Sequence, residues 1–128
     1  MLEAALVMPV LTMLTFGACQ YGYLIYLKST LQSAAAAGAR ASVARTATNT
    51  NVTTLVTNMM TAAGISSSKY TLTLNPTDVS SLSAGTQITV TVSSSWGTLG
   101  PGLLSAGYGG VSASKQITGV AVVQKEGT

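Results

Sequence analysis

The order of hydrophobic and polar residues divides the chain into an apolar start, a stretch of small residues and a region of strand-like alternation. Glu3 is the only Asp, Glu, Lys or Arg among residues 1–27. A run of this length suffices for an α-helix that spans the hydrocarbon core of a bilayer. A secretory signal peptide fits poorly, because no positive charge precedes the run and no small-residue cleavage site ends it. The pattern therefore predicts a membrane-inserted helix.

Residues 28–47 are rich in alanine, the best helix-forming residue. They extend the predicted helix to about 45 residues, a length typical of helices that lie in a membrane or against partner helices. Small side chains would let a neighbouring helix approach closely. The predicted packing positions are Gly17, Gly22, Ala34, Ala35 and Gly38. Pro9 cannot donate a hydrogen bond to Ala5 and predicts a kink or locally melted stretch near residues 5–9.

The rest of the chain predicts a short helix and three strands. TATNTN at 46–51 is a break that leads into helical spacing over 52–63, and Gly64 fits the position just past the helix end. Strict alternation follows at 70–74 and 87–93, and a third strand is expected at about 112–124. Three such strands predict an antiparallel meander, with its apolar face covered by the short helix and by the lower half of the long one.

The expected fold class is therefore α+β, a long N-terminal hydrophobic helix plus a small domain. The predicted units are the helix at 1–47, with 1–27 as the transmembrane or filament-core part, and a globular domain at 48–128. Between the second and third strands, residues 96–110 are rich in Gly and Pro and predict a long loop. The large side chains available to pack this loop down are Trp96, Leu99, Leu103, Leu104 and Tyr108.

Aromatic residues gather in the second half of the apolar run. They are Phe16, Tyr21, Tyr23 and Tyr26, and Lys28 follows them. Tyrosines followed by a lysine are typical of a belt at a membrane–water interface. Packing between subunits is a competing use of the same rings. Cys19 cannot form an intrachain disulfide, because it is the only cysteine. We expect it to be a small buried hydrophobic residue, and an intermolecular bridge is the alternative.

Charge is scarce, which excludes several functions. Asp, Glu, Lys and Arg make up 7% of the chain, and the net charge is +3. The six basic residues are scattered, so no nucleic-acid partner is expected. Without histidine, and with only three acidic residues, the sequence offers no zinc cluster and no paired carboxylates. We expect no enzymatic activity, no catalytic residue, no metal and no cofactor.

Glu3 and the charge order raise two questions of their own. A carboxylate near the end of an apolar helix either caps the first turn or pairs with a cation, such as the terminal amine of a neighbouring chain. The first positive charges follow the apolar run, so the positive-inside rule would place the following domain in the cytoplasm. This conflict disappears if a basic leader once preceded Met1, and it persists if Met1 is the initiator.

Several segments of the sequence together resemble the TadE-like pseudopilins of tight-adherence (Tad) pilus systems. The resemblance rests on EAALVMP at 3–9, Phe16-Gly17, Tyr21-Gly22, LQSAA at 31–35 and Gly-Ala-Arg at 38–40. The C-terminal half is also similar, with a Thr/Val strand, an apolar Gly/Pro loop and a last Ala/Ser-rich strand. Two features depart from the family pattern: Gln20 and Tyr23 stand where a charged pair is common, and the leader is missing.

The resemblance implies a precursor whose leader a prepilin peptidase removes in the bacterial inner membrane. It also implies extraction of the helix by an assembly machine, with Glu3 guiding assembly next to Met1 and Pro9 interrupting the helix. We expect a structural pilin that polymerises with copies of itself into an extracellular type IV (Tad-like) pilus for surface attachment. The alternatives are a minor or priming pseudopilin of the same machinery, and a monomeric membrane-anchored binding module.

Overall fold

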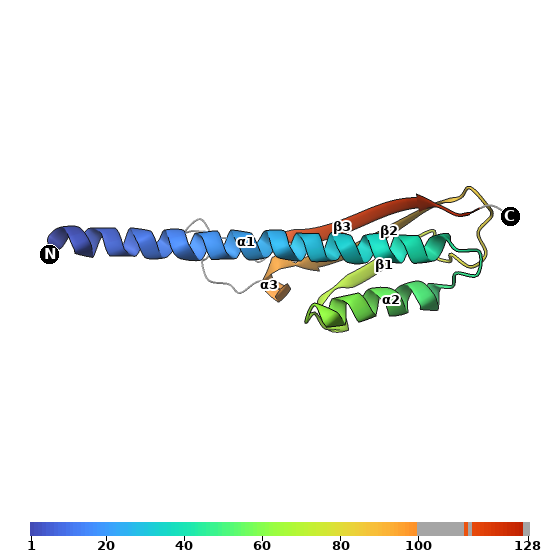
Figure 1. The fold of residues 1–128 in the computed structure, drawn as a ribbon, viewed down its shortest axis with the longest axis horizontal. Coiled ribbons are helices and arrows are strands. Elements are labelled where there is room, and N and C mark those ends of the chain that lie inside the picture. Colours follow the sequence, from blue (N-terminus) through green and yellow to red (C-terminus); the bar gives the residue numbers. More distant parts are fainter. Residues whose placement is uncertain (100–111, 113, 127–128) are drawn as a thin grey trace.

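A computed structural model of the protein describes residues 1–99, 112 and 114–126, and it has the predicted α+β architecture. One long helix carries a small domain at its C-terminal half, while its N-terminal half projects as a rod (Figure 1). The elements in chain order are α1 (Leu2–Val43), α2 (Asn49–Ala62), the 3₁₀ turn η1 (Ser67–Lys69), β1 (Thr71–Asn75), β2 (Gln87–Ser95), α3 (Trp96–Leu99) and β3 (Gln116–Gln124).

The α1 helix runs through Pro9 without interruption, so the predicted kink or locally melted stretch near residues 5–9 is wrong. Proline removes one backbone bond, the one that the Ala5 carbonyl would accept. The bonds on either side remain, including the one from the Ala5 amide to the Met1 carbonyl at 3.2 Å. Figure 1 shows a straight rod at this point. The surrounding apolar and alanine-rich sequence therefore carries the helix across a single missing bond.

The three strands form one antiparallel sheet in the order β1-β2-β3, as predicted. Alternation sets the two faces of β2: Ile88, Val90 and Val92 are buried, while the threonines between them point to the other face. The strand ends differ from the prediction by a few residues. The second strand extends to Ser95, and the third begins at Gln116 rather than near residue 112.

The C-terminal half of α1 lies along the apolar face of this sheet, with α2 beside it (Figure 1). Leu27, Leu31 and the small residues that follow are part of the same core as the strands. Closest approach occurs at Gly119 of β3, where an added Cβ would lie 2.4 Å from the carbonyl carbon of Leu31. Only a residue without a side chain allows the helix backbone to rest on the strand here.

The α2 helix begins earlier than the apolar spacing predicted. Thr48 is its N-cap, and the Thr48 hydroxyl accepts a hydrogen bond from the Asn51 amide at 3.2 Å. The helix therefore starts at Asn49 rather than at Val52. Its C-terminal end follows the prediction, because Gly64 adopts the left-handed conformation with φ +82° just beyond it.

A buried lysine ties the end of β3 to the end of α1. Lys125 is only 5% exposed, and its ammonium group donates to three backbone carbonyls. The acceptors are Ala44 at 2.8 Å, Val79 at 3.0 Å and Ser42 at 3.2 Å. Carbonyls at a helix C-terminus have no partner within the helix and carry partial negative charge, so a cation there is favourable. Lys125 thus holds the C-terminal end of the covered half of α1 in place.

Candidate functional site: the uncovered half of α1

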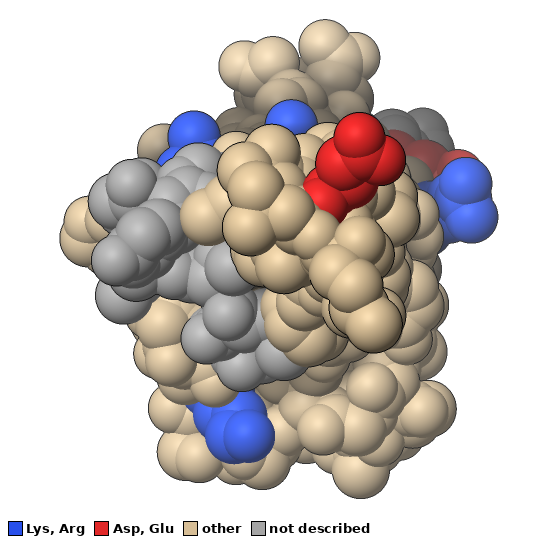
Figure 2. Space-filling view, turned by 90° about the vertical axis from the view of Figure 1, so that its left-hand side faces the viewer, with Lys and Arg blue, Asp and Glu red and all other residues tan. Residues whose placement is uncertain are grey.

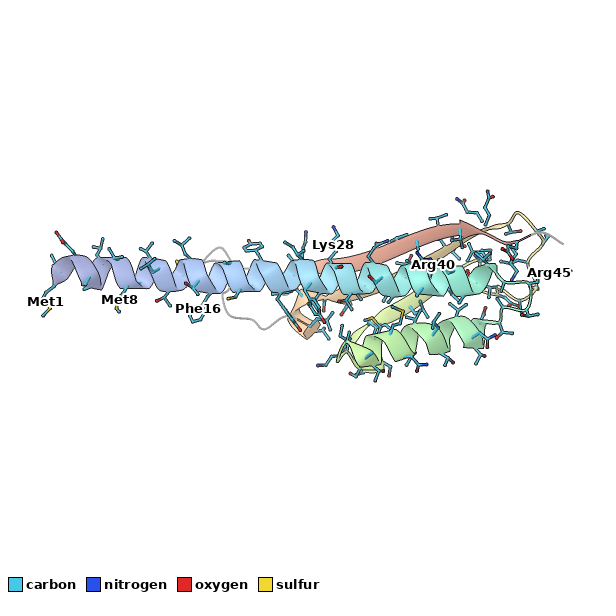
Figure 3. All side chains as sticks on the ribbon, viewed as in Figure 1. Met1, Met8, Phe16, Lys28, Arg40 and Arg45 are labelled. Carbon is cyan, nitrogen blue, oxygen red and sulfur yellow. The ribbon has the colours of Figure 1, made fainter. Side chains whose placement is uncertain are left out.

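The N-terminal half of α1 presents large apolar side chains with no other described element against them. Met1, Met8 and Phe16 lie along the projecting part of the helix in Figure 3, and Leu14 is 65% exposed. By length and composition this helix can cross a membrane. Exposed apolar residues of this size in one continuous rod require an apolar environment, either lipid or other helices.

Glu3 and the amino group of Met1 lie together at the free end of this rod. Glu3 is in the first turn of α1 and is exposed, and no bond or ion pair joins it to another described residue. The helix dipole favours a carboxylate in this position. If the rod is buried in apolar surroundings, an unpaired carboxylate becomes costly unless a cation is supplied from outside the chain. The structure thus leaves Glu3 available for a contact with another molecule.

Polar groups within the rod bond mainly to the helix itself. The Thr12 hydroxyl donates to the Met8 carbonyl at 2.8 Å, and the Thr15 hydroxyl donates to the Leu11 carbonyl at 2.8 Å. Such bonds let a threonine face lipid or another helix without an unsatisfied hydroxyl. A shallow apolar depression lies around Pro9, and its lining residues are Ala5, Met8, Pro9, Thr12, Met13 and Phe16.

The aromatic residues mark the junction between the rod and the domain. Tyr23 stacks on Tyr26 with ring centroids 5.8 Å apart, and it meets Trp96 edge-on at 6.2 Å. Tyr21 and Tyr26 are about half exposed, and Phe16 lies further towards the free end. Trp96 itself is buried, and its indole Nε1 has no hydrogen-bond partner among the described residues. Tyr23 is thus both part of the aromatic group and a contact to the domain.

The predicted loop at 96–110 is corrected at its beginning. Trp96–Leu99 form a short helical turn, α3, directly after β2. The hydroxyls of Ser95 and Thr98 lie 2.7 Å apart and connect the strand end to this turn. A Gly/Pro-rich composition concealed the turn, since four residues are too few to show periodicity. Leu103, Leu104 and Tyr108 lie outside the described residues.

The predicted helix-packing residues separate into two groups. Ala34, Ala35 and Gly38 are buried inside the domain, and an added Cβ on Gly38 would lie 2.8 Å from Val56 Cγ2 of α2. Gly22 has nothing within 4 Å of its Cβ position, and Gly17 is half-buried.

Cys19 differs from what the sequence led us to expect, and the neighbouring Gln20 is an exception to the exposure of this half. Cys19 is exposed in the isolated chain, not buried within it as expected, because no described element packs on that side of the rod. Gln20, one of the positions that depart from the family pattern, is fully buried.

Sequence reasoning missed Gln32, Gly119 and Lys125. Gln32 exchanges two hydrogen bonds with the backbone of Val120. Gly119 gave a signal, because a lone glycine in a strand often marks a close backbone approach. No signal identified the other two, since an isolated Gln or Lys is ordinary on a surface. Among the described residues, no group of three His, Cys, Asp or Glu side chains is placed to hold a metal ion.

Comparison with known proteins identifies the segment that carries this site. Residues 1–40 match the family model of TadE-like proteins. The match confirms the resemblance over that segment. No curated protein and no solved structure matches the chain.

Proposed function

We propose that this chain, whose first 40 residues match TadE-like proteins, is a structural pilin subunit that polymerises through the N-terminal half of α1. The observation that carries the proposal is the exposed apolar rod, which no other described element covers over most of its length and which ends in Glu3 and the Met1 amine. In the inner membrane, lipid covers the rod. In an extracellular Tad-like pilus used for surface attachment, the rods of other copies take the place of lipid.

The surface of the domain is compatible with dense packing of identical copies. Viewed from the N-terminal end, the molecule is mostly uncharged, and its basic groups are separated from one another (Figure 2). With a net charge of +3, neighbouring copies repel each other only weakly. The same scarcity of charge supports the absence of a nucleic-acid partner, and the scarcity of acid–base groups supports a non-enzymatic role.

The proposed partners follow from this life cycle and from the family match. They are the inner membrane before assembly, a prepilin peptidase, the pilus assembly machinery and other copies of the chain. A minor or priming pseudopilin is a second candidate, favoured by the same match to TadE-like proteins. Immunogold labelling separates the two roles: a main subunit labels the whole fibre, and a minor one labels its end or sparse points.

Electron microscopy of sheared surface material tests the proposal. Cells with the wild-type chain should release fibres that contain it, and Glu3→Ala should abolish or strongly reduce these fibres while the chain still inserts into the membrane. Glu126→Ala is the matched control, because it removes an exposed carboxylate from the other end of the chain. A wild-type chain that stays monomeric in detergent and never enters fibres would instead identify a membrane-anchored module.

A further inference from the structure

The β3 edge of the sheet carries an unusual contact with α1. Among the described strands β3 pairs with β2 alone, so its other side is an edge. The side chain of Gln32, from α1, occupies the middle of that edge. Its Nε2 donates to the Val120 carbonyl at 2.6 Å, and its Oε1 accepts from the Val120 amide at 3.1 Å.

This pair of bonds is the one that a residue of a neighbouring strand would make. In an antiparallel ladder, both backbone groups of alternate residues point to the same side of the strand. Because Val120 turns its amide and carbonyl towards Gln32, Thr118 and Val122 present theirs to the same edge. A further strand that paired with β3 would have to bond to Val120, which lies between Thr118 and Val122. Gln32 already fills this central position with a primary amide, whose donor and acceptor match those of a peptide group.

The edge that Gln32 covers has the composition of a strand that pairs with copies of itself. The sequence of β3, QITGVAVVQ, contains no charge and no proline. Val120 is 42% exposed and Val122 is 52% exposed, so apolar β-branched side chains flank the edge. Uncharged β-branched segments at a sheet edge are templates for intermolecular pairing unless something blocks them.

The position of Gln32 is fixed by the contact between α1 and Gly119. An added Cβ at Gly119 would lie 2.5 Å from the Gln32 amide nitrogen, so the helix backbone rests against the strand at this residue. The side chain therefore begins close to the β3 edge and needs to span only a short distance to reach Val120. A glutamine on a freely moving helix would lose more side-chain entropy in making the same two bonds.

We propose that Gln32 acts as a gatekeeper that keeps the β3 edge from pairing with the β3 edge of a second copy of this chain. Its role is separate from the proposed polymerisation through α1. Wherever copies are concentrated in a membrane or a fibre, edge pairing competes with helix packing. Gln32 prevents edge pairing because it bonds the Val120 amide and carbonyl from within the same chain.

The test uses the purified full chain in detergent micelles, with thioflavin T fluorescence and infrared spectroscopy to detect intermolecular strands. Gln32→Ala should give a several-fold rise in concentration-dependent β-rich assembly over wild type. Gln124→Ala is the matched control, because it removes another exposed glutamine, on β3 itself, and should behave as wild type. Equal assembly by the Gln32→Ala variant and wild type would overturn the proposal.

A double variant separates edge pairing from simple unfolding. Val122 is exposed, and a lysine on an edge strand opposes pairing between copies. Adding Val122→Lys to Gln32→Ala should therefore return assembly to the wild-type level. If the double variant assembles as strongly as Gln32→Ala alone, the assemblies arise from unfolded chain and the gatekeeper role is wrong. Loss of α1-dependent fibres in cells would bear on the proposed function and not on this result.

Discussion

The two halves of α1 share one backbone and have opposite surroundings. Leu14, in the first half, is 65% exposed, whereas Leu31, in the second, is fully buried. The first half is the more apolar one, whereas the second carries Lys28, Arg40 and several polar residues among its alanines. The covered half also presents small side chains, its alanines and Gly38, which let the sheet and α2 approach closely. The uncovered half keeps large exposed apolar side chains, which indicate lipid or a partner outside the chain.

The largest expected effect comes from a glycine that the covered half requires. Gly119→Ala places a Cβ 2.4 Å from backbone atoms of Leu31, and neither backbone can move without breaking its own element. We expect the domain to lose about 3 kcal/mol of unfolding free energy. Urea unfolding of the full chain in detergent, followed by near-UV circular dichroism of Trp96, measures this loss.

Gly22→Ala is the control from the uncovered half, because its Cβ position is open. Alanine should be neutral or should stabilise the helix by about 0.5–1 kcal/mol. Equal losses at Gly119 and Gly22 would contradict the division of α1 into a covered and an uncovered half. If Gly22→Ala leaves unfolding unchanged but reduces fibres in cells, Gly22 contacts a neighbouring helix in the assembly.

Lys125 is expected to have the next largest effect. Lys125→Met keeps the length of the side chain but leaves the carbonyls of Ser42, Ala44 and Val79 without their donor. We expect a loss of about 2 kcal/mol, because hydrogen bonds from a charged donor are stronger than neutral ones. Lys115→Met, at an exposed position, should change stability by less than about 0.5 kcal/mol. Matching denaturation curves for the two variants would show that the lysine does not hold the end of α1.

The N-cap of α2 should contribute less. Thr48→Ala removes the hydroxyl that accepts from the Asn51 amide, and the expected loss is about 1 kcal/mol. The reason is that water only partly replaces the lost acceptor of the Asn51 amide at the helix start. Thr50→Ala, one residue into the exposed first turn, is the control and should leave the unfolding midpoint unchanged or slightly raised, because alanine is the better helix former. A similar loss in both variants would show that the loss does not come from the Thr48 cap.

Periodicity predicted the elements well, because each has a face that the sequence repeats. The alternation in residues 87–93 and the helical spacing in residues 52–63 correspond to β2 and α2. The contacts between α1 and the strands could not be predicted from the sequence. Nothing local indicates that Gln32 bonds to Val120, since the contact joins residues 88 positions apart. The apolar run and Glu3 of the candidate site could be recognised in the sequence. Only the structure shows that no other described element covers most of this run.

The smallest expected effect concerns Asp78, an exposed residue in the loop between β1 and β2. Hydrogen bonds from the Ser80 hydroxyl and the Ser80 amide, both to Asp78 Oδ1 at 2.6 and 2.9 Å, lower the pKa of the Asp78 carboxyl. A lowered pKa in the folded state means that the carboxylate stabilises the fold above its unfolded pKa of about 3.9. That contribution is lost as the pH falls through the folded pKa. Asp78→Asn should therefore lower the melting temperature slightly at neutral pH, and the difference from wild type should vanish in strong acid. Glu126→Gln is the control that removes a different carboxylate. If the difference in melting temperature between Asp78→Asn and wild type persists unchanged in strong acid, the charge of Asp78 is not its cause.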